Sequence, residues 1–218
     1  MFLGHFSFGL AAKAFAPGTS LGSLFLASQL LDFIWSTLLI LGVERVRIVP
    51  GATETTPLNF DYYPFSHSLL LAVIWGLVVA LVYLLFRRSP RGAVVMGGVV
   101  VSHWFLDLLV HQSDLPLYPG GALFGMGLWS SKSGTVVVEI LLFLVSLGIY
   151  FNATETMDDH GDWRIGCLLL VLLGIYIRDL SGPLPSSVSA VAWTVEAQWL
   201  LVLWGYWADR HRVSVTHA

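Results

Sequence analysis

One apolar stretch of the sequence carries three residues of the types that bind metal ions. His103, Asp107 and His111 occupy positions i, i+4 and i+8 in the run that begins at Ser102. An α-helix turns about 100° per residue, so this spacing places all three side chains on one stripe of one helix. Imidazole and carboxylate groups are costly in an apolar surrounding unless they have a partner or a function. We therefore predict that the stripe belongs to a functional site, and metal binding suits its residue types.

Other apolar stretches carry four more residues of these types. His103 and Asp107 are about one helical turn apart and can share an ion, whereas His111 lies about 12 Å from His103 along a helix. We expect His111 to serve a second ion or the substrate. If the apolar stretches cross a membrane, their alternating directions bring these residues to a similar depth. The predicted metal ligands are His5, Asp32, His67, His103, Asp107 and His111, and the further carboxylate is Glu139.

These residue types favour hydrolytic metal chemistry. A divalent ion lowers the pKa of a water that it binds to about 7 and neutralises charge on a phosphoryl or carbonyl oxygen. We expect zinc, in one or two copies, with Asp32 or Glu139 as the catalytic general base. The alternative is that these side chains only hydrogen-bond between packed helices, as polar residues in membranes often do.

The composition indicates an integral membrane protein. Of the 218 residues, 56% are hydrophobic and only 11% are charged, whereas a soluble domain has about 25% charged residues. The net charge of −3 offers no basic face for phosphate backbones, which argues against nucleic acid as a partner. Membrane lipid or another amphiphilic substrate is the partner that we expect. The single cysteine, Cys167, lies in an apolar run and cannot form an intramolecular disulfide.

The apolar segments predict an all-α fold, a polytopic transmembrane bundle of six or seven helices. A helix of about 20 apolar residues spans a bilayer. The segment 2–16 is shorter and contains Lys13, so it is either a short span or a helix packed obliquely against the others. We expect one transmembrane domain over 1–218, with the metal-site half in 1–112 and additional helices without a motif in 113–218. The predicted spans are 20–42, 66–86, 92–112, 133–152, 163–180 and 187–208.

The basic residues predict the orientation. Arg87, Arg88 and Arg91 fill one tight turn, and basic residues favour the cytoplasmic side. Alternation then places 153–163 and the C-terminus inside, and the loops 43–65, 113–132 and 181–186 outside, in a multi-pass membrane protein. Loop 113–132 is rich in proline and glycine and is either a lid, with Lys132 near a headgroup, or a plain connector. Three histidines in polar segments are interpreted as surface residues: His160, His211 and His217.

The motifs resemble a known family. Gly4-His5, Asp32, Ser66-His67-Ser68 and Ser102-His103-x-x-x-Asp107 look like the YdjM-type inner-membrane proteins, LexA-regulated in some bacteria and classed by their motifs as metal-dependent hydrolases. That family is similar to zinc-dependent phospholipase C, in which the ligand order His, Asp, His, His-x-x-x-Asp, His holds zinc. The resemblance covers about residues 1–112. It implies zinc ligands at His5, Asp32, His67, His103 and Asp107, with His111 as the following histidine.

The resulting hypothesis is a membrane-embedded metal-dependent hydrolase. It would act on a phosphoester or another lipid-accessible ester at the outer face of the inner membrane. One alternative is an ion or small-molecule transporter that uses the buried His and Asp residues, with a route lined by Glu196 and Asp179. The other alternative is a non-catalytic membrane subunit that keeps the polar residues for packing.

Overall fold

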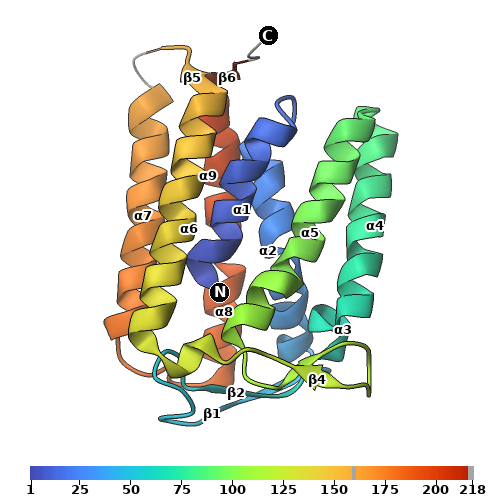
Figure 1. The fold of residues 1–218 in the computed structure, drawn as a ribbon, viewed down its shortest axis with the longest axis vertical. Coiled ribbons are helices and arrows are strands. Elements are labelled where there is room, and N and C mark those ends of the chain that lie inside the picture. The colour runs from blue at the N-terminus through green and yellow to red at the C-terminus, as the bar shows by residue number, and fades with distance from the viewer. Residues whose placement is uncertain (159–160, 216–218) are drawn as a thin grey trace.

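The chain folds into a helical bundle, which confirms the all-α prediction (Figure 1). The computed structural model describes residues 1–158 and 161–215, so His160 and His217 lie outside the described residues. The main helices are α1 (Phe2–Phe15), α2 (Leu21–Ile40), α4 (Leu69–Arg87), α5 (Pro90–Val110), α6 (Lys132–Ala153), α7 (Gly161–Ser181), α8 (Val188–Glu196) and α9 (Trp199–Asp209).

Short elements close both ends of the bundle. The loop end carries the antiparallel pairs β1 (Arg45–Ile48) with β2 (Leu58–Tyr62) and β3 (Leu115–Pro116) with β4 (Leu123–Phe124), together with α3 (Pro64–His67) and the 3-10 helix η1 (Leu128–Ser130). The opposite end, here the turn end, carries the Arg88–Ser89 turn and the antiparallel pair β5 (Thr154–Thr156) with β6 (Arg212–Ser214) (Figure 1). Loops 43–65, 113–132 and 181–186 thus lie together at one end, as alternation predicts.

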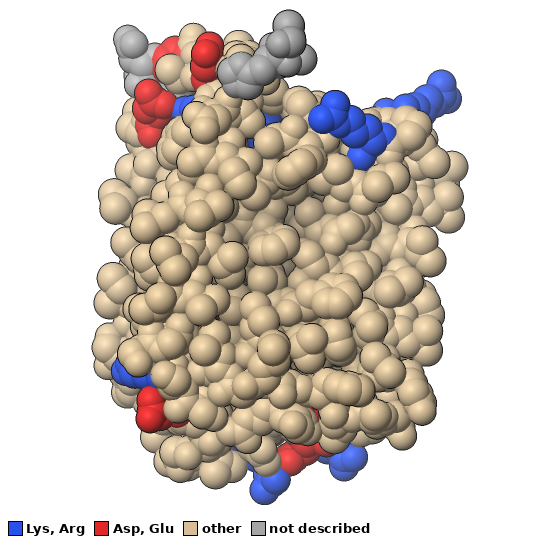
Figure 2. All heavy atoms as spheres, in the orientation of Figure 1, with Lys and Arg blue, Asp and Glu red and all other residues tan. Residues whose placement is uncertain are grey.

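Within the described residues, five helical segments are long and apolar enough to cross a membrane, and these fit a membrane protein. They are α2, α4, α5, α6 and the pair α8–α9, and between the ends the visible face carries few charged side chains (Figure 2). Six or seven spans are not confirmed. Helix α7 has the length of a span, but Asp162 and Arg164 lie near one end and Arg178 and Asp179 near the other.

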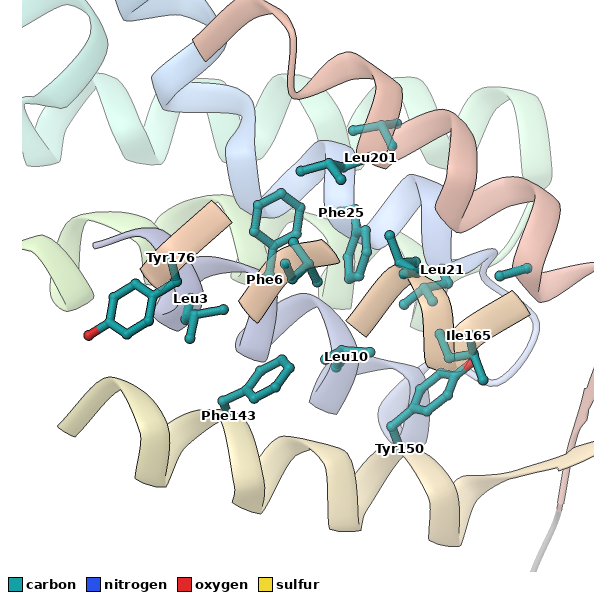
Figure 3. Close-up of a cluster of buried hydrophobic side chains, with 14 of the residues drawn as sticks. Leu3, Phe6, Leu10, Leu21, Phe25, Phe143, Tyr150, Ile165, Tyr176 and Leu201 are labelled. Atoms are coloured by element: carbon teal, nitrogen blue, oxygen red, sulfur yellow. The ribbon is translucent and has the colours of Figure 1, made fainter. Parts of the chain in front are cut away.

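Helix α1 is an internal helix rather than a span. Its 14 residues rise only about 21 Å, and its N-terminus lies inside the bundle (Figure 1). Leu3, Phe6 and Leu10 are fully buried and pack with Phe25 and Phe143 in one apolar cluster (Figure 3). Burying such side chains contributes about 1.5–3 kcal/mol each. The site residues of α1 are therefore held at the centre of the molecule.

Lys13 does not interrupt α1. Its ammonium group lies 2.8 Å from an Asp209 carboxylate oxygen of α9 and donates a hydrogen bond to the Thr19 carbonyl at 3.0 Å. An ion pair makes a buried lysine tolerable in an apolar surrounding. The pair ties the C-terminal end of α1 to α9 at the turn end.

Helices α4 and α5 cross at two glycines. A Cβ atom on Gly97 would lie 2.8 Å from the Gly76 carbonyl oxygen, and a Cβ atom on Gly76 would lie 2.9 Å from the Gly97 carbonyl oxygen. Only glycine permits this backbone approach, which keeps α5 in the position from which it presents His103 and Asp107.

The crossing generates the first prediction. Gly97→Ala forces backbone against backbone and should destabilise the protein by about 1–3 kcal/mol, seen as a lower thermal midpoint in detergent. The control is Gly98→Ala, because a Cβ atom there meets nothing within 4 Å. Equal midpoints for the two variants would contradict the close crossing.

Candidate metal centre

Four elements bring five of the predicted ligands together in the interior. His5 comes from α1, Asp32 from α2, His67 from α3, and His103 and Asp107 from α5. They form two groups, His5–His103–Asp107 and Asp32–His67–His103, and within each group the ligand-type atoms lie within 4.8 Å of one another. His103 belongs to both groups. No described residue of 113–218 belongs to either of the two groups.

Asp107 is the centre of the cluster. Its Oδ1 atom lies 3.1 Å from His5 Nε2, and its Oδ2 atom lies 3.1 Å from His103 Nε2 and 3.6 Å from His67 Nε2. The α-amino group of Met1 is fully buried and lies 3.0 Å from Oδ1. One carboxylate thus faces three imidazoles and one ammonium group. Oδ1 faces His5 and the ammonium group, and Oδ2 faces His67 and His103.

Asp32 forms the second group from the other side. Its Oδ1 atom lies 3.5 Å from His67 Nε2 and 3.7 Å from His103 Nε2. The Asp32 side chain is 25% exposed, whereas the His67 and His103 side chains are 5% and 0% exposed. Asp32 is therefore the member of the cluster that an incoming molecule can reach.

The backbone of α2 fixes the orientation of His103. Its Nδ1 atom lies 2.8 Å from the Ser28 carbonyl oxygen, which can only accept, so Nδ1 carries a proton. In a neutral ring Nε2 then has a lone pair. This buried Nε2 has no hydrogen bond, although an Asp107 oxygen lies 3.1 Å away. Two acceptors at this distance require a cation or a proton between them.

A relay of three side chains fixes the orientation of His67. The Ser66 hydroxyl donates to Glu44 Oε2 at 2.6 Å, so its oxygen accepts from His67 Nδ1 at 2.7 Å. Glu44 is 1% exposed and also accepts from the Phe65 and Ser66 backbone N–H groups. His67 Nε2 is left free to face Asp32 and Asp107. Hydrogen bonds of this kind behind a ligating histidine are typical of metal sites.

His111 lies in neither group. Helix α5 ends at Val110 and His111 is its C-cap: the His111 backbone N–H donates to the Asp107 carbonyl at 2.8 Å, and its ψ of 149° turns the following chain away from the helix. Its Nδ1 atom lies 3.0 Å from Asp114 Oδ1 and 3.2 Å from the Tyr63 hydroxyl. Burial, followed by the charge of Asp114, raises the pKa of the Tyr63 hydroxyl well above its usual value, so this hydroxyl stays protonated.

Glu139 also lies in neither group. It is buried on α6 and accepts from the backbone N–H of Gly4 at 3.2 Å. A carboxylate in this position stabilises the N-terminus of a helix, here the first turn of α1 that carries His5. Its role as a general base stays a prediction.

The sequence pattern missed two residues beside the cluster. Glu44 follows the apolar segment in a polar loop, where a single carboxylate gives no recognisable signal. Gln29 lies one helical turn before Asp32 and is fully buried, with no hydrogen bond to either amide atom. A buried amide without partners is rare and marks a place for a bound molecule or water.

Loop 113–132 is tied to the helices. The Leu117 carbonyl accepts from the Leu70 backbone N–H at 3.0 Å, and the Trp104 indole donates to the Pro116 carbonyl at 3.2 Å. Lys132 donates to the Leu180 carbonyl.

Glu196, which the transporter alternative places along a transport route, accepts hydrogen bonds from the hydroxyls of Ser36 and Thr37.

The relay behind His67 generates the second prediction. Glu44→Gln weakens the acceptor for the Ser66 hydroxyl, loosens the orientation of His67, and should lower divalent-metal affinity about 10–100-fold. Zinc titration of the purified protein measures this. Glu54→Gln in the same loop is the control, since Glu54 accepts from the Lys132 backbone outside the cluster. If both variants bind zinc as the wild type does, the relay has no part in metal binding.

No family model matches this chain, and neither a curated protein nor a solved structure matches it. The resemblance to the YdjM-type proteins therefore stays a prediction. What the site can do is inferred from its own geometry.

Proposed function

We propose that this protein is a membrane-embedded, metal-dependent hydrolase that acts on a phosphoester of an amphiphilic substrate. The observation that carries the proposal is the hydrogen-bond-free Nε2 of His103, which faces the Asp107 carboxylate while its Nδ1 is bound to the Ser28 carbonyl. Three imidazoles and two carboxylates around that point form a donor set suited to zinc.

The cluster has donors for one or two ions. An imidazole nitrogen has one lone pair, so His103 can serve only one ion. A carboxylate has two oxygens, and those of Asp107 face different histidines. Asp107 would be the carboxylate common to the histidine donors, and His5, His67, His103 and Asp32 would complete the set that holds the metal. A bound divalent cation would supply Lewis acidity toward a phosphoryl oxygen and lower the pKa of a water molecule.

Asp32 is the residue that we assign to proton transfer. It is the most exposed member of the cluster and lies within 4 Å of two histidines. From there its carboxylate can accept a proton from the attacking water, and the histidines hold it in place. Gln29, next to Asp32 on α2, would orient the substrate with its free amide. Because the cluster lies inside an apolar bundle, a substrate with an apolar part suits it.

The third prediction tests the metal. Protein purified without chelators should contain one or two equivalents of zinc or another divalent metal per chain by elemental analysis. His103→Ala and Asp107→Ala should lose most of it, because His103 belongs to both groups and Asp107 faces all three histidines. His111→Ala should keep it, because His111 lies in neither group. His211→Ala is a further control, since His211 pairs with Asp158 at the turn end.

The fourth prediction tests the reaction. Wild-type protein should hydrolyse an activated phosphodiester, and Asp32→Asn should lower the rate about 10²–10⁴-fold while retaining metal. A metal-free wild type, or a metal-loaded protein that moves ions across liposomes without hydrolysis, would refute the proposal. Alanine variants that lose only their fold would indicate the packing role instead.

A further inference from the structure

A second recess lies at the turn end of the bundle, away from the metal centre. It is a cavity of about 640 Å³ between α2, α4 and α9, with Met96 of α5 in its wall. Cavities of roughly 300–1,000 Å³ hold small-molecule ligands. The α4–α5 hairpin stands apart from the other helices at this end (Figure 1). The cavity extends along α4 from Val78 to Arg87, a length of about 13 Å.

The walls and the mouth of the cavity differ in chemistry. The walls are apolar, with Leu26, Val79, Val82 and Phe86 among the lining residues. Two arginines, Arg87 and Arg210, line it beside the turn end, where the helices α4 and α9 finish. A guanidinium group at the end of an apolar wall is suited to the headgroup region of a bilayer.

Four of the other polar residues of the cavity are already paired. The Ser23 and Tyr206 hydroxyls lie 2.9 Å apart, and the Tyr83 hydroxyl lies 2.9 Å from that of Thr19. Asp209 is held by Lys13. Neither Arg87 nor Arg210 has an ion pair with a residue in the described ranges. The cavity thus presents apolar surface inside and uncompensated positive charge at its mouth.

We infer that this cavity binds one acyl chain of an anionic membrane phospholipid, with the lipid phosphate between Arg87 and Arg210. The apolar walls match the chain, and the two guanidinium groups match the phosphate in charge and in hydrogen-bond geometry. A zwitterionic or neutral lipid matches the walls but carries no net negative charge for the mouth.

The lipid site is separate from the metal centre. Asp32 lies six residues beyond Leu26 on α2, about 9 Å along the helix, and His103 lies seven residues beyond Met96 on α5, about 10 Å. The bound phospholipid is therefore a resident lipid rather than the substrate, and the inference does not depend on hydrolase activity.

The fifth prediction tests this site by native mass spectrometry of the full-length protein in mild detergent. After exposure to mixed vesicles of phosphatidylglycerol and phosphatidylcholine, one phosphatidylglycerol per chain should remain bound. Val82→Trp should fill the cavity and abolish retention, whereas Leu81→Trp, on the same helix and outside the lining, should keep it. In the absence of lipid, both variants should have the thermal midpoint of the wild type. Their metal content is measured separately and reports on the candidate metal centre.

The charge requirement is tested with arginine variants. Arg87→Gln with Arg210→Gln should weaken phosphatidylglycerol retention about tenfold or more and leave phosphatidylcholine unchanged. Arg88→Gln removes the same charge from the same turn outside the lining and should have little effect. Equal retention of both lipids by the wild type, or undiminished retention in Val82→Trp, would overturn the inference.

Discussion

The buried carboxylate of Asp107 is the constraint on which the arrangement of the bundle depends. An ionised carboxylate without partners in an apolar interior is strongly destabilising, and removing one partner of a buried charge pair typically costs about 3–5 kcal/mol. Here the partners come from three different elements: α1, α3 and α5. Each must be in place for Asp107 to be satisfied, so the carboxylate selects one packing of these elements.

Helix α1 illustrates that selection. It is too short to cross a membrane, and its sequence is apolar enough to pack in several ways. At its N-terminal end His5 meets Asp107 and the Gly4 N–H meets Glu139, while at its C-terminal end Lys13 meets Asp209. These polar contacts with α5, α6 and α9 fix the depth and rotation of α1, and the apolar cluster around Phe6 supplies most of the burial.

The sequence predicts much of this cluster because helical spacing is local information. His103 and Asp107 share a helix face by their spacing alone, and topology places His5, Asp32 and His67 at a similar depth; the structure brings all five together, while their role as ligands stays a prediction. His111 lies in neither group, and its part at a second ion or at the substrate stays a prediction, because its contacts with Tyr63 and Asp114 depend on loop segments. Glu44 and the pairing of Lys13 with Asp209 were missed because both depend on contacts between distant segments. Six or seven spans are not confirmed, because α1 is short and the charged ends of α7 count against a membrane crossing.

The cluster around Asp107 and the cavity at the turn end carry charged groups of opposite sign. Toward the loop end, the cluster gathers the Asp32 and Asp107 carboxylates with the Nε2 atoms of His67 and His103. At the turn end, the cavity between α2, α4 and α9 presents the donors Arg87 and Arg210. Apolar side chains separate the two sets, and the helical distance of about 10 Å is too long for direct contact. Within the fold they cannot neutralise each other, which is the reason for proposing a cation at one site and an anionic headgroup at the other.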